Sequence, residues 1–410
     1  MKVWRVYCPL VGSARFASTH WRHVESPAPI PRQFFKNDAL PNTPTMTIRI
    51  GEMIKKKIVT SEPLEYISGD DNFQSQTAEG AILKYEGELY DLLKNPVADE
   101  SFQLMCQVKN HGIVQFREHF RELLKQTTPH NRFLMSGERR CGKTLSCYAL
   151  LITYMKENFN GLIIPALHLS PWFQDTSTTQ MIHTGEGLLD FPEINAEFLR
   201  FFVACNTFSQ NPNKDAISNC LLLEDERWTS NIYSFKGDSL MDVAKIGIST
   251  PPVAGHVIQT IFSTILEQGI SSLVIADNAN LLSEIHSSKL EDLRDLNAKD
   301  WWNQPELVPN KITLLRSLKE FISLHKEGRV YLTMDQRRNI GDKVIKETGD
   351  IPHEIVAIPN TPSEKEYLQF LNHLRFENFI SKDLNVEQVT ELTYLTGRNY
   401  ADTFKYMFII

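Results

Sequence analysis

Short apolar runs alternate with amphipathic stretches through the body of the chain. A strand that is covered on both faces of a sheet is apolar throughout, whereas a strand with one wet face alternates. Each run is short enough for one strand and is bounded by polar or turn-forming residues. The pattern therefore predicts five buried strands, at 133–135, 161–167, 271–276, 328–335 and 353–358.

Apolar residues between and after these runs recur at helical spacing. Ser363 and Glu366 form a capping-box pattern, and Gly269 and Gly397 stand where glycine commonly ends a helix. Residues 80–126 carry two further apolar stripes, which we interpret as a helical N-terminal region. The other predicted helices begin near residue 144 and at about 191–208, 239–246, 253–268, 312–325, 363–376, 386–395 and 400–408.

This alternation of strands and helices indicates an α/β fold built on a doubly wound parallel sheet. Such sheets bind their ligands at the carboxyl ends of the strands. The residues that follow the first and third predicted strands are therefore the first candidates for chemistry.

The first strand leads into a phosphate-loop motif. Residues 137–144 match Gly-x-x-x-x-Gly-Lys-Ser/Thr in full, between a strand and a helix. The loop N–H groups and the helix N-terminus suit a phosphate chain, Lys143 suits the outer phosphates, and the Thr144 hydroxyl suits Mg²⁺. The alternative is a glycine turn before an ordinary helix. The candidate nucleotide-binding residues are Gly137, Glu138, Arg139, Arg140, Cys141, Gly142, Lys143, Thr144 and Leu145.

The third strand ends in an aspartate. Asp277 follows the run 271–276, and its carboxylate is expected at the carboxyl edge of the sheet, where a Walker B aspartate holds the water shell of Mg²⁺. The candidate metal residues are therefore Thr144 and Asp277. The next strand brings Thr333 or Asp335 to the position at which a sensor residue reads the outermost phosphate in many such folds.

The residue after Asp277 bears on catalysis. Active ATPases of this kind usually place a glutamate there, which orients the attacking water. Asn278 occupies that position and cannot accept a proton. We therefore expect at most a weak GTPase, and we assign no catalytic residue.

The composition of the chain argues against several classes of protein and of site. The net charge of −7 argues against a chain that wraps nucleic acid by general attraction, and no apolar run approaches the ~20 residues of a membrane span. The six cysteines form no Cys-x-x-Cys pair, so a zinc site and a disulfide framework are not indicated. Cys141 lies beside a helix N-terminus and Lys143, which favour the thiolate, and we expect thiol reagents to modify it readily in the empty protein.

The first 79 residues differ from the body. Residues 1–24 carry Lys and Arg but no acid, with hydroxylated and apolar residues between them, as in a mitochondrial transit peptide. A plain disordered start is the alternative. Residues 25–79 contain spaced prolines, which indicate an extended arm. The lysine run 55–57 in this arm is typical of a solvated surface, with RNA phosphate contact as the alternative.

The order of elements resembles the AAA+ and STAND-like branch of P-loop NTPases, and this resemblance implies a five-stranded parallel sheet in the order 5-1-4-3-2. We divide the body into a helical N-terminal region at 80–126, a P-loop nucleotide-binding domain at 127–360 and a C-terminal helical lid at 361–410. The nucleotide-binding domain carries an insertion at about 168–250.

Residues 80–410 resemble the death-associated protein three family, small-subunit protein twenty-nine of the mitochondrial ribosome. The resemblance implies a protein of the head of the small subunit that binds a guanine nucleotide, GTP or GDP, with Mg²⁺. The sequence departs from the family at Arg140, where a glycine is usual, and this bulky residue argues against tight nucleotide binding. The segments that carry the resemblance are 134–146, Gly237–Leu240 with Val243, Gly247 and Ile248, and 273–281.

We therefore predict a structural component of the mitochondrial small ribosomal subunit, located in the matrix, that supports mitochondrial translation. Its expected partners are small-subunit proteins and large-subunit bridge contacts, with limited contact to rRNA. The alternative is a free matrix P-loop NTPase that acts as a switch or remodelling ATPase. The family's association with apoptosis is supported by no residue of this sequence.

Overall fold

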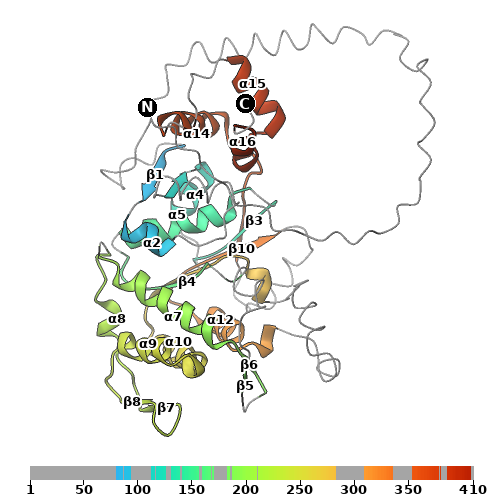
Figure 1. Cartoon of the computed structure of the whole chain (residues 1–410). Coiled ribbons are helices and arrows are strands. Elements are labelled where there is room, and N and C mark those ends of the chain that lie inside the picture. The colour runs from blue at the N-terminus through green and yellow to red at the C-terminus, as the bar shows by residue number, and fades with distance from the viewer. Residues whose placement is uncertain are drawn as a thin grey trace, which may run out of the picture. The chain divides into compact units, whose positions relative to one another are not determined.

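The computed structural model describes residues 80–93, 112–125, 131–138, 141–156, 159–169, 182–209, 211–282, 309–335, 353–379 and 386–407, apart from positions 86, 116, 168, 185, 186 and 378. These parts belong to one compact unit that spans residues 54–410 (Figure 1). The predicted transit peptide and most of the predicted extended arm lie outside the described residues, as do Arg139 and Arg140.

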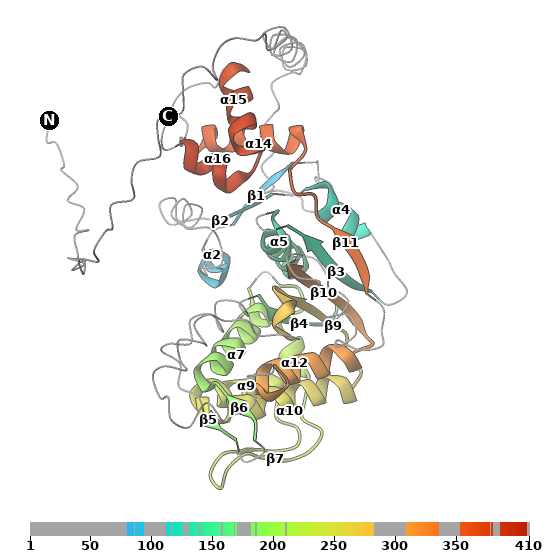
Figure 2. The same cartoon turned by 90° about the vertical axis from the view of Figure 1, so that its right-hand side faces the viewer.

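A five-stranded parallel sheet lies at the centre of this unit, and all five predicted strands are confirmed (Figure 2). The strands lie in the order β11-β3-β10-β9-β4, which reads 5-1-4-3-2 when the five are numbered along the chain. Every residue of β3, β4 and β9 is buried, as apolar runs covered on both faces require. The strands are β3 (Arg132–Gly137), β4 (Leu162–Ala166), β9 (Ser272–Ala276), β10 (Gly328–Asp335) and β11 (Glu354–Ala357).

The two faces of the sheet contribute to separate hydrophobic clusters, because successive strand residues point to opposite faces. In β4, Leu162 and Ile164 join the cluster formed with α7, α9, α10 and α12, whereas Ile163 joins the cluster formed with α5. Residues 146–155 of α5 are all buried, so this helix is covered on every side. The covering helices are α5 (Lys143–Lys156), α7 (Pro192–Thr207), α9 (Leu240–Ser249), α10 (Ala254–Glu267) and α12 (Thr313–Leu324).

The open edge of β4 is covered by a side chain that imitates a neighbouring strand. The Asn206 amide on α7 accepts a hydrogen bond from the Ile163 N–H at 2.8 Å and donates one to the Ile163 carbonyl at 2.7 Å. Asn206 is buried, so its amide satisfies backbone groups that an edge strand otherwise leaves unpaired.

The remaining predicted helices are also confirmed, and two of them begin with the expected serine caps. Ser239 Oγ accepts from the Asp242 N–H at the start of α9, and Ser363 forms a complete capping box with Glu366 at the start of α14. The C-terminal helices are α14 (Glu364–Phe376), α15 (Val386–Thr396) and α16 (Tyr400–Met407).

The insertion between β4 and α9 also contains short elements that the sequence pattern did not predict. They are two antiparallel hairpins and one helical turn. Their bounds are β5 (Ile182–His183) with β6 (Leu189–Asp190), β7 (Glu226–Arg227) with β8 (Tyr233–Ser234), and α8 (Ala216–Asn219).

Outside the insertion, single 3₁₀ turns lie at Pro251–Val253, Ala279–Leu282 and Pro309–Lys311.

The prediction that residues 80–126 are helical is wrong at two places. An antiparallel pair of strands, β1 (Ile82–Tyr85) and β2 (Gly112–Gln115), precedes α2 (Glu88–Leu93) and α4 (Glu118–Lys125) respectively. Both strands are nearly fully buried, so their short apolar runs lack the alternation that separates a strand from a helix. Their hydrophobic residues therefore fitted the helical spacing equally well.

None of the described helices combines the length and the apolar composition that a membrane crossing requires.

A buried ion pair joins the segment between β2 and α4 to the first turn of α14, which lies beside β1 in both views (Figures 1 and 2). Arg117 Nε lies 3.3 Å from Glu366 Oε2, and the two residues are only 6% and 3% exposed. Glu366 also accepts hydrogen bonds from the backbone N–H groups of Ser363 and Glu118, each at 2.9 Å. The Glu366 carboxylate thus accepts hydrogen bonds from backbone N–H groups at the starts of both α14 and α4.

We expect Arg117→Met to lower the free energy of unfolding by about 3 kcal/mol, because it leaves the Glu366 carboxylate buried without its cation. The measurement is urea unfolding at neutral pH. Arg200→Met is the matched control: Arg200 pairs with Glu197 across an exposed turn of α7, and its loss should cost less than about 1 kcal/mol. Equal effects of the two variants would contradict the proposed role of the buried pair.

Candidate functional site

The candidate site lies where β3 ends and α5 begins. Two glycines make this connection possible. Gly142 precedes α5 with a φ of +99°, which side chains rarely adopt, and a Cβ on Gly137 would lie 2.6 Å from Cys141 Sγ. The backbone therefore makes a tight turn that brings Cys141 back over the end of β3.

Lys143 lies inside this turn. Its ammonium group donates to the carbonyl oxygens of Gly137 and Glu138, each at 2.6 Å, and lies 3.9 Å from Cys141 Sγ. The positive charge is thus held within the loop, next to the N-terminus of α5. Both features favour an anion at this place.

Asp277 and Thr144, the two predicted metal residues, are brought into contact. The Thr144 hydroxyl donates to Asp277 Oδ2 at 2.8 Å, although 132 residues separate the two in the chain. Thr333 donates to the other carboxylate oxygen, Oδ1, at 2.6 Å. Asp277 therefore joins the first turn of α5 to the carboxyl ends of β9 and β10. We call these three side chains the threonine–aspartate junction.

Burial raises the pKa of Asp277, and hydrogen bonds from Thr333 and Thr144 and the charge of Lys143 act in the opposite direction. The pKa of Asp277 is raised on balance, so the cost of removing the carboxylate from water exceeds the stabilisation that these three neighbours provide. A cation close to the carboxylate would relieve this cost.

Thr333 holds Asp277 in place from β10. Its hydroxyl donates to Asp277 and accepts from the Asn278 N–H at 2.8 Å, while its side chain is 1% exposed. Asn278 has a φ of +59°, a left-handed conformation that asparagine tolerates better than most residues. Thr333, one of the two residues expected at the sensor position, thus contacts Asp277.

Side chains of Arg117, just before α4, and of His119, on α4, contact the loop and the start of α5, and the sequence pattern did not predict these contacts. Arg117 Nη1 donates to the Cys141 carbonyl at 2.5 Å. His119 Nε2 lies 3.0 Å from Ser146 Oγ, which in turn donates to the Gly142 carbonyl at 3.1 Å. Burial, with the charge of Arg117, lowers the pKa of His119 to about 3, so this imidazole is neutral at physiological pH.

The other predicted site residues fall on the same connection. Glu138 follows β3 and its N–H lies 3.4 Å from Asn360 Oδ1, while Leu145 is half-buried in the first turn of α5. Cys141 is 3% exposed. This burial argues against the expectation that reagents modify it readily, because reactive cysteines need solvent access.

The donor set at the junction fits magnesium better than a transition metal. No group of three or more His, Cys, Asp or Glu side chains suited to a metal occurs in the described parts of the chain. Mg²⁺ is commonly held by one or two protein oxygens together with substrate phosphates and water. Thr144 and Asp277 supply such oxygens.

These features define an α/β protein whose candidate ligand site lies at the carboxyl edge of its parallel sheet. The sequence model of the family described as Mitochondrial ribosomal death-associated protein 3 matches residues 114–394, which is more than half of the chain. The chain therefore belongs to this family. It is a mitochondrial ribosomal protein, and its location is the mitochondrion. A search of curated proteins found no match.

We expect Asp277→Asn to stabilise the nucleotide-free protein at pH 7. The folded-state pKa of Asp277 is raised, so ionisation costs more in the folded than in the unfolded chain, and stability decreases as the pH rises past the unfolded value of ~3.9. The amide has no such cost. Urea unfolding should show a gain near pH 7 that disappears below about pH 4.

Asp242→Asn is the control for this experiment. Hydrogen bonds from Ser239 and Lys245 lower the pKa of Asp242, so the control should lose a little stability at pH 7. A loss of stability in Asp277→Asn at pH 7 would show that the carboxylate serves the fold rather than a ligand.

Proposed function

We propose that the chain is a structural component of the mitochondrial small ribosomal subunit that binds GTP or GDP with Mg²⁺ through residues 137–144. The observation that carries the proposal is the hydrogen bond between Thr144 and Asp277. It joins the first turn of the helix after the loop to the carboxyl end of β9, as a P-loop NTPase requires for its metal. The sheet order supports the same class.

Residues that the structure describes can supply each of the proposed contacts. The N-terminus of α5 and the Lys143 ammonium face the phosphates, and the oxygens of Thr144 and Asp277 hold the metal side. Bound Mg²⁺ would supply positive charge between the phosphate oxygens and this carboxylate. The choice of guanine derives from the family resemblance, since the contacts described here concern the phosphates.

Asn278 supports a binding rather than a hydrolytic role. Its amide cannot act as a base, and its backbone N–H is bonded to Thr333. The nucleotide then acts as a structural ligand. At a concentration ~100 times its dissociation constant it stabilises the folded state by about 2.7 kcal/mol.

The mitochondrial small-subunit proteins are the proposed partners, with large-subunit bridge contacts and limited contact to rRNA. The negative net charge fits a protein that binds mainly other proteins. The supposed transit peptide at 1–24 fits import into the matrix. A free matrix switch or remodelling ATPase is the weaker candidate, because it needs a hydrolysis rate that Asn278 does not support.

The full chain is expected to retain a guanine nucleotide on purification, which chromatography of the extracted ligand would identify. Lys143→Ala should weaken GDP binding by about 2 kcal/mol, or roughly thirtyfold, because a charged hydrogen-bond donor to the phosphates is lost. Lys245→Ala removes an equally charged side chain from the exposed face of α9 and should bind as the wild type does. Unchanged affinity in Lys143→Ala would overturn the proposed site.

Single-turnover hydrolysis of GTP should be far slower than the ~1 per second of an ordinary enzyme. Purified protein is mixed with a substoichiometric amount of GTP and the GDP formed is followed with time. Turnover at or above that rate would favour the free NTPase.

A further inference from the structure

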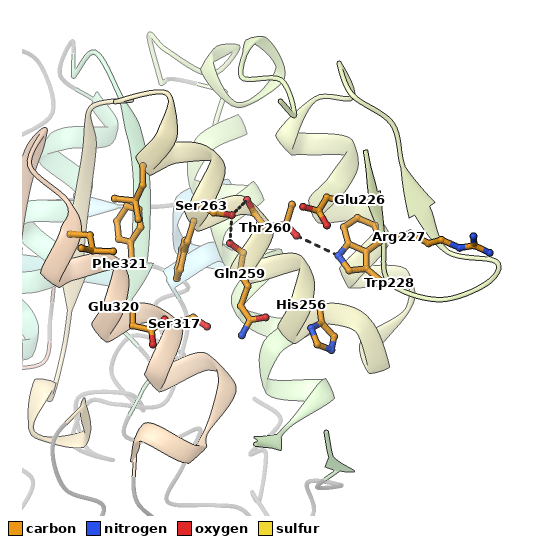
Figure 3. A pocket seen from close by; sticks show the side chains of 13 residues that line it. Glu226, Arg227, Trp228, His256, Gln259, Thr260, Ser263, Ser317, Glu320 and Phe321 are labelled. Atoms are coloured by element: carbon orange, nitrogen blue, oxygen red, sulfur yellow. Dashed lines mark hydrogen bonds between the residues drawn. The ribbon is translucent and has the colours of Figure 1, made fainter. Parts of the chain in front are cut away.

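A groove opens between the β7–β8 hairpin of the insertion and the helices α10 and α12 (Figure 3). It lies among helices that pack against the sheet face opposite α5, away from the threonine–aspartate junction. Its volume is about 550 Å³. The hairpin forms one wall with Glu226 and Trp228, and the two helices form the other.

Hydrogen bonds join the hairpin wall of this groove to α10 and close the hairpin itself. Trp228 Nε1 donates to Thr260 Oγ1 on α10 at 3.4 Å, and the Trp228 N–H donates to the Ile232 carbonyl at 3.0 Å across the hairpin. At the base of the insertion, Gln268 Nε2 donates to the Leu221 carbonyl at 2.5 Å. The groove is therefore formed before any partner binds, which lowers the entropic cost of association.

The apolar surface of the groove comes from the helices. Phe262 and Phe321 pack against each other with ring centroids 4.7 Å apart and are only 3% and 1% exposed, whereas Leu324, which also lines the groove, is 63% exposed. On the hairpin, Tyr233 and Phe235 contact each other at 5.0 Å and are 49% and 58% exposed. Leu324 is thus the large apolar side chain that the groove itself exposes, and Tyr233 and Phe235 add exposed apolar surface on the neighbouring hairpin, as is typical of protein–protein contact sites.

The charge at the hairpin end of the groove is negative. Burial raises the pKa of Glu226, and the nearby charges of Glu224 and Glu267 raise it further. No hydrogen bond or ion pair joins the carboxylates of these three residues to another described residue. A positive group is therefore the charge complement of this end of the groove.

Arg227 also lines the groove, but its positive charge does not neutralise the carboxylates at the hairpin end. The Arg227 guanidinium donates to the carbonyl oxygens of Thr229 and Ser230, each at 3.3 Å, and points away from the groove in Figure 3. On the opposite wall, Glu320 is already paired with Arg316 at 2.8 Å, so Glu226 is the carboxylate left to receive a cation.

We propose that this groove binds an extended segment of a neighbouring mitochondrial ribosomal protein that carries a lysine or arginine next to an apolar side chain. The cation lies against Glu226, and the apolar side chain packs on Leu324. The Gln259 amide, which lines the groove, can both donate to and accept from the backbone of the segment. RNA is disfavoured because its phosphates would meet carboxylates.

The test places a photo-crosslinking amino acid at Gln259 of the full chain, expressed in cells and irradiated in intact mitochondria. We expect a crosslink to a segment of one identified mitochondrial ribosomal protein, and the mapped peptide should contain a lysine or arginine. Glu226→Lys should reduce the yield about tenfold and Glu226→Gln less, since reversal adds repulsion to the lost attraction. Glu197→Lys, on the exposed face of α7, should leave the yield unchanged.

Thermal unfolding of the purified variants separates a binding defect from a folding defect. Neither Glu226 variant should unfold below the wild-type temperature, because Glu226 has no ion pair to lose within the described structure and lies near two other carboxylates. Crosslinks to rRNA or to this chain itself, the absence of any crosslink, or an undiminished yield in Glu226→Lys would each overturn the proposal.

Discussion

A buried carboxylate shared between two threonine hydroxyls holds the carboxyl edge of this sheet together. Asp277 ends β9, Thr333 lies on β10 and Thr144 lies in the first turn of α5, so one side chain sets the relative positions of three elements. The arrangement costs free energy, because the carboxylate is desolvated more than its partners compensate. The cation proposed to bind beside Asp277 would offset this cost.

The rest of the molecule positions this junction. Separate hydrophobic clusters fix the sheet from its two faces, and Asn206 covers the backbone of its open edge. A residue outside the sheet and its covering helices, Arg117, also contacts the loop before α5. Arg117 contacts the Cys141 carbonyl and, through Glu366, the first turn of α14. Arg117 and Glu366 therefore link the candidate loop to the segment before α4 and to the start of α14.

The sequence predicted the features that depend on local pattern and left out those that depend on contact between distant residues. The five strands were readable because fully buried strands are apolar throughout, and the loop and Asp277 because their positions along the chain are specific. The strands β1 and β2 were missed, since short apolar runs carry no period. Arg117 and His119 were missed because nothing in their local sequence distinguishes a buried arginine or a neutral histidine from residues on a solvated helix. Thr333 was placed near the site, but its bond to Asp277 is visible only once β9 and β10 lie side by side.

The measurement that tests this account most directly is the magnesium dependence of GDP affinity in the wild type and in Asp277→Asn, titrated with and without a chelator. If the threonine–aspartate junction holds the metal, Mg²⁺ should strengthen binding to the wild type by about tenfold or more and have little effect on the variant, a difference of at least ~1.4 kcal/mol. Equal magnesium dependence in the two proteins, or none in the wild type, would contradict the account.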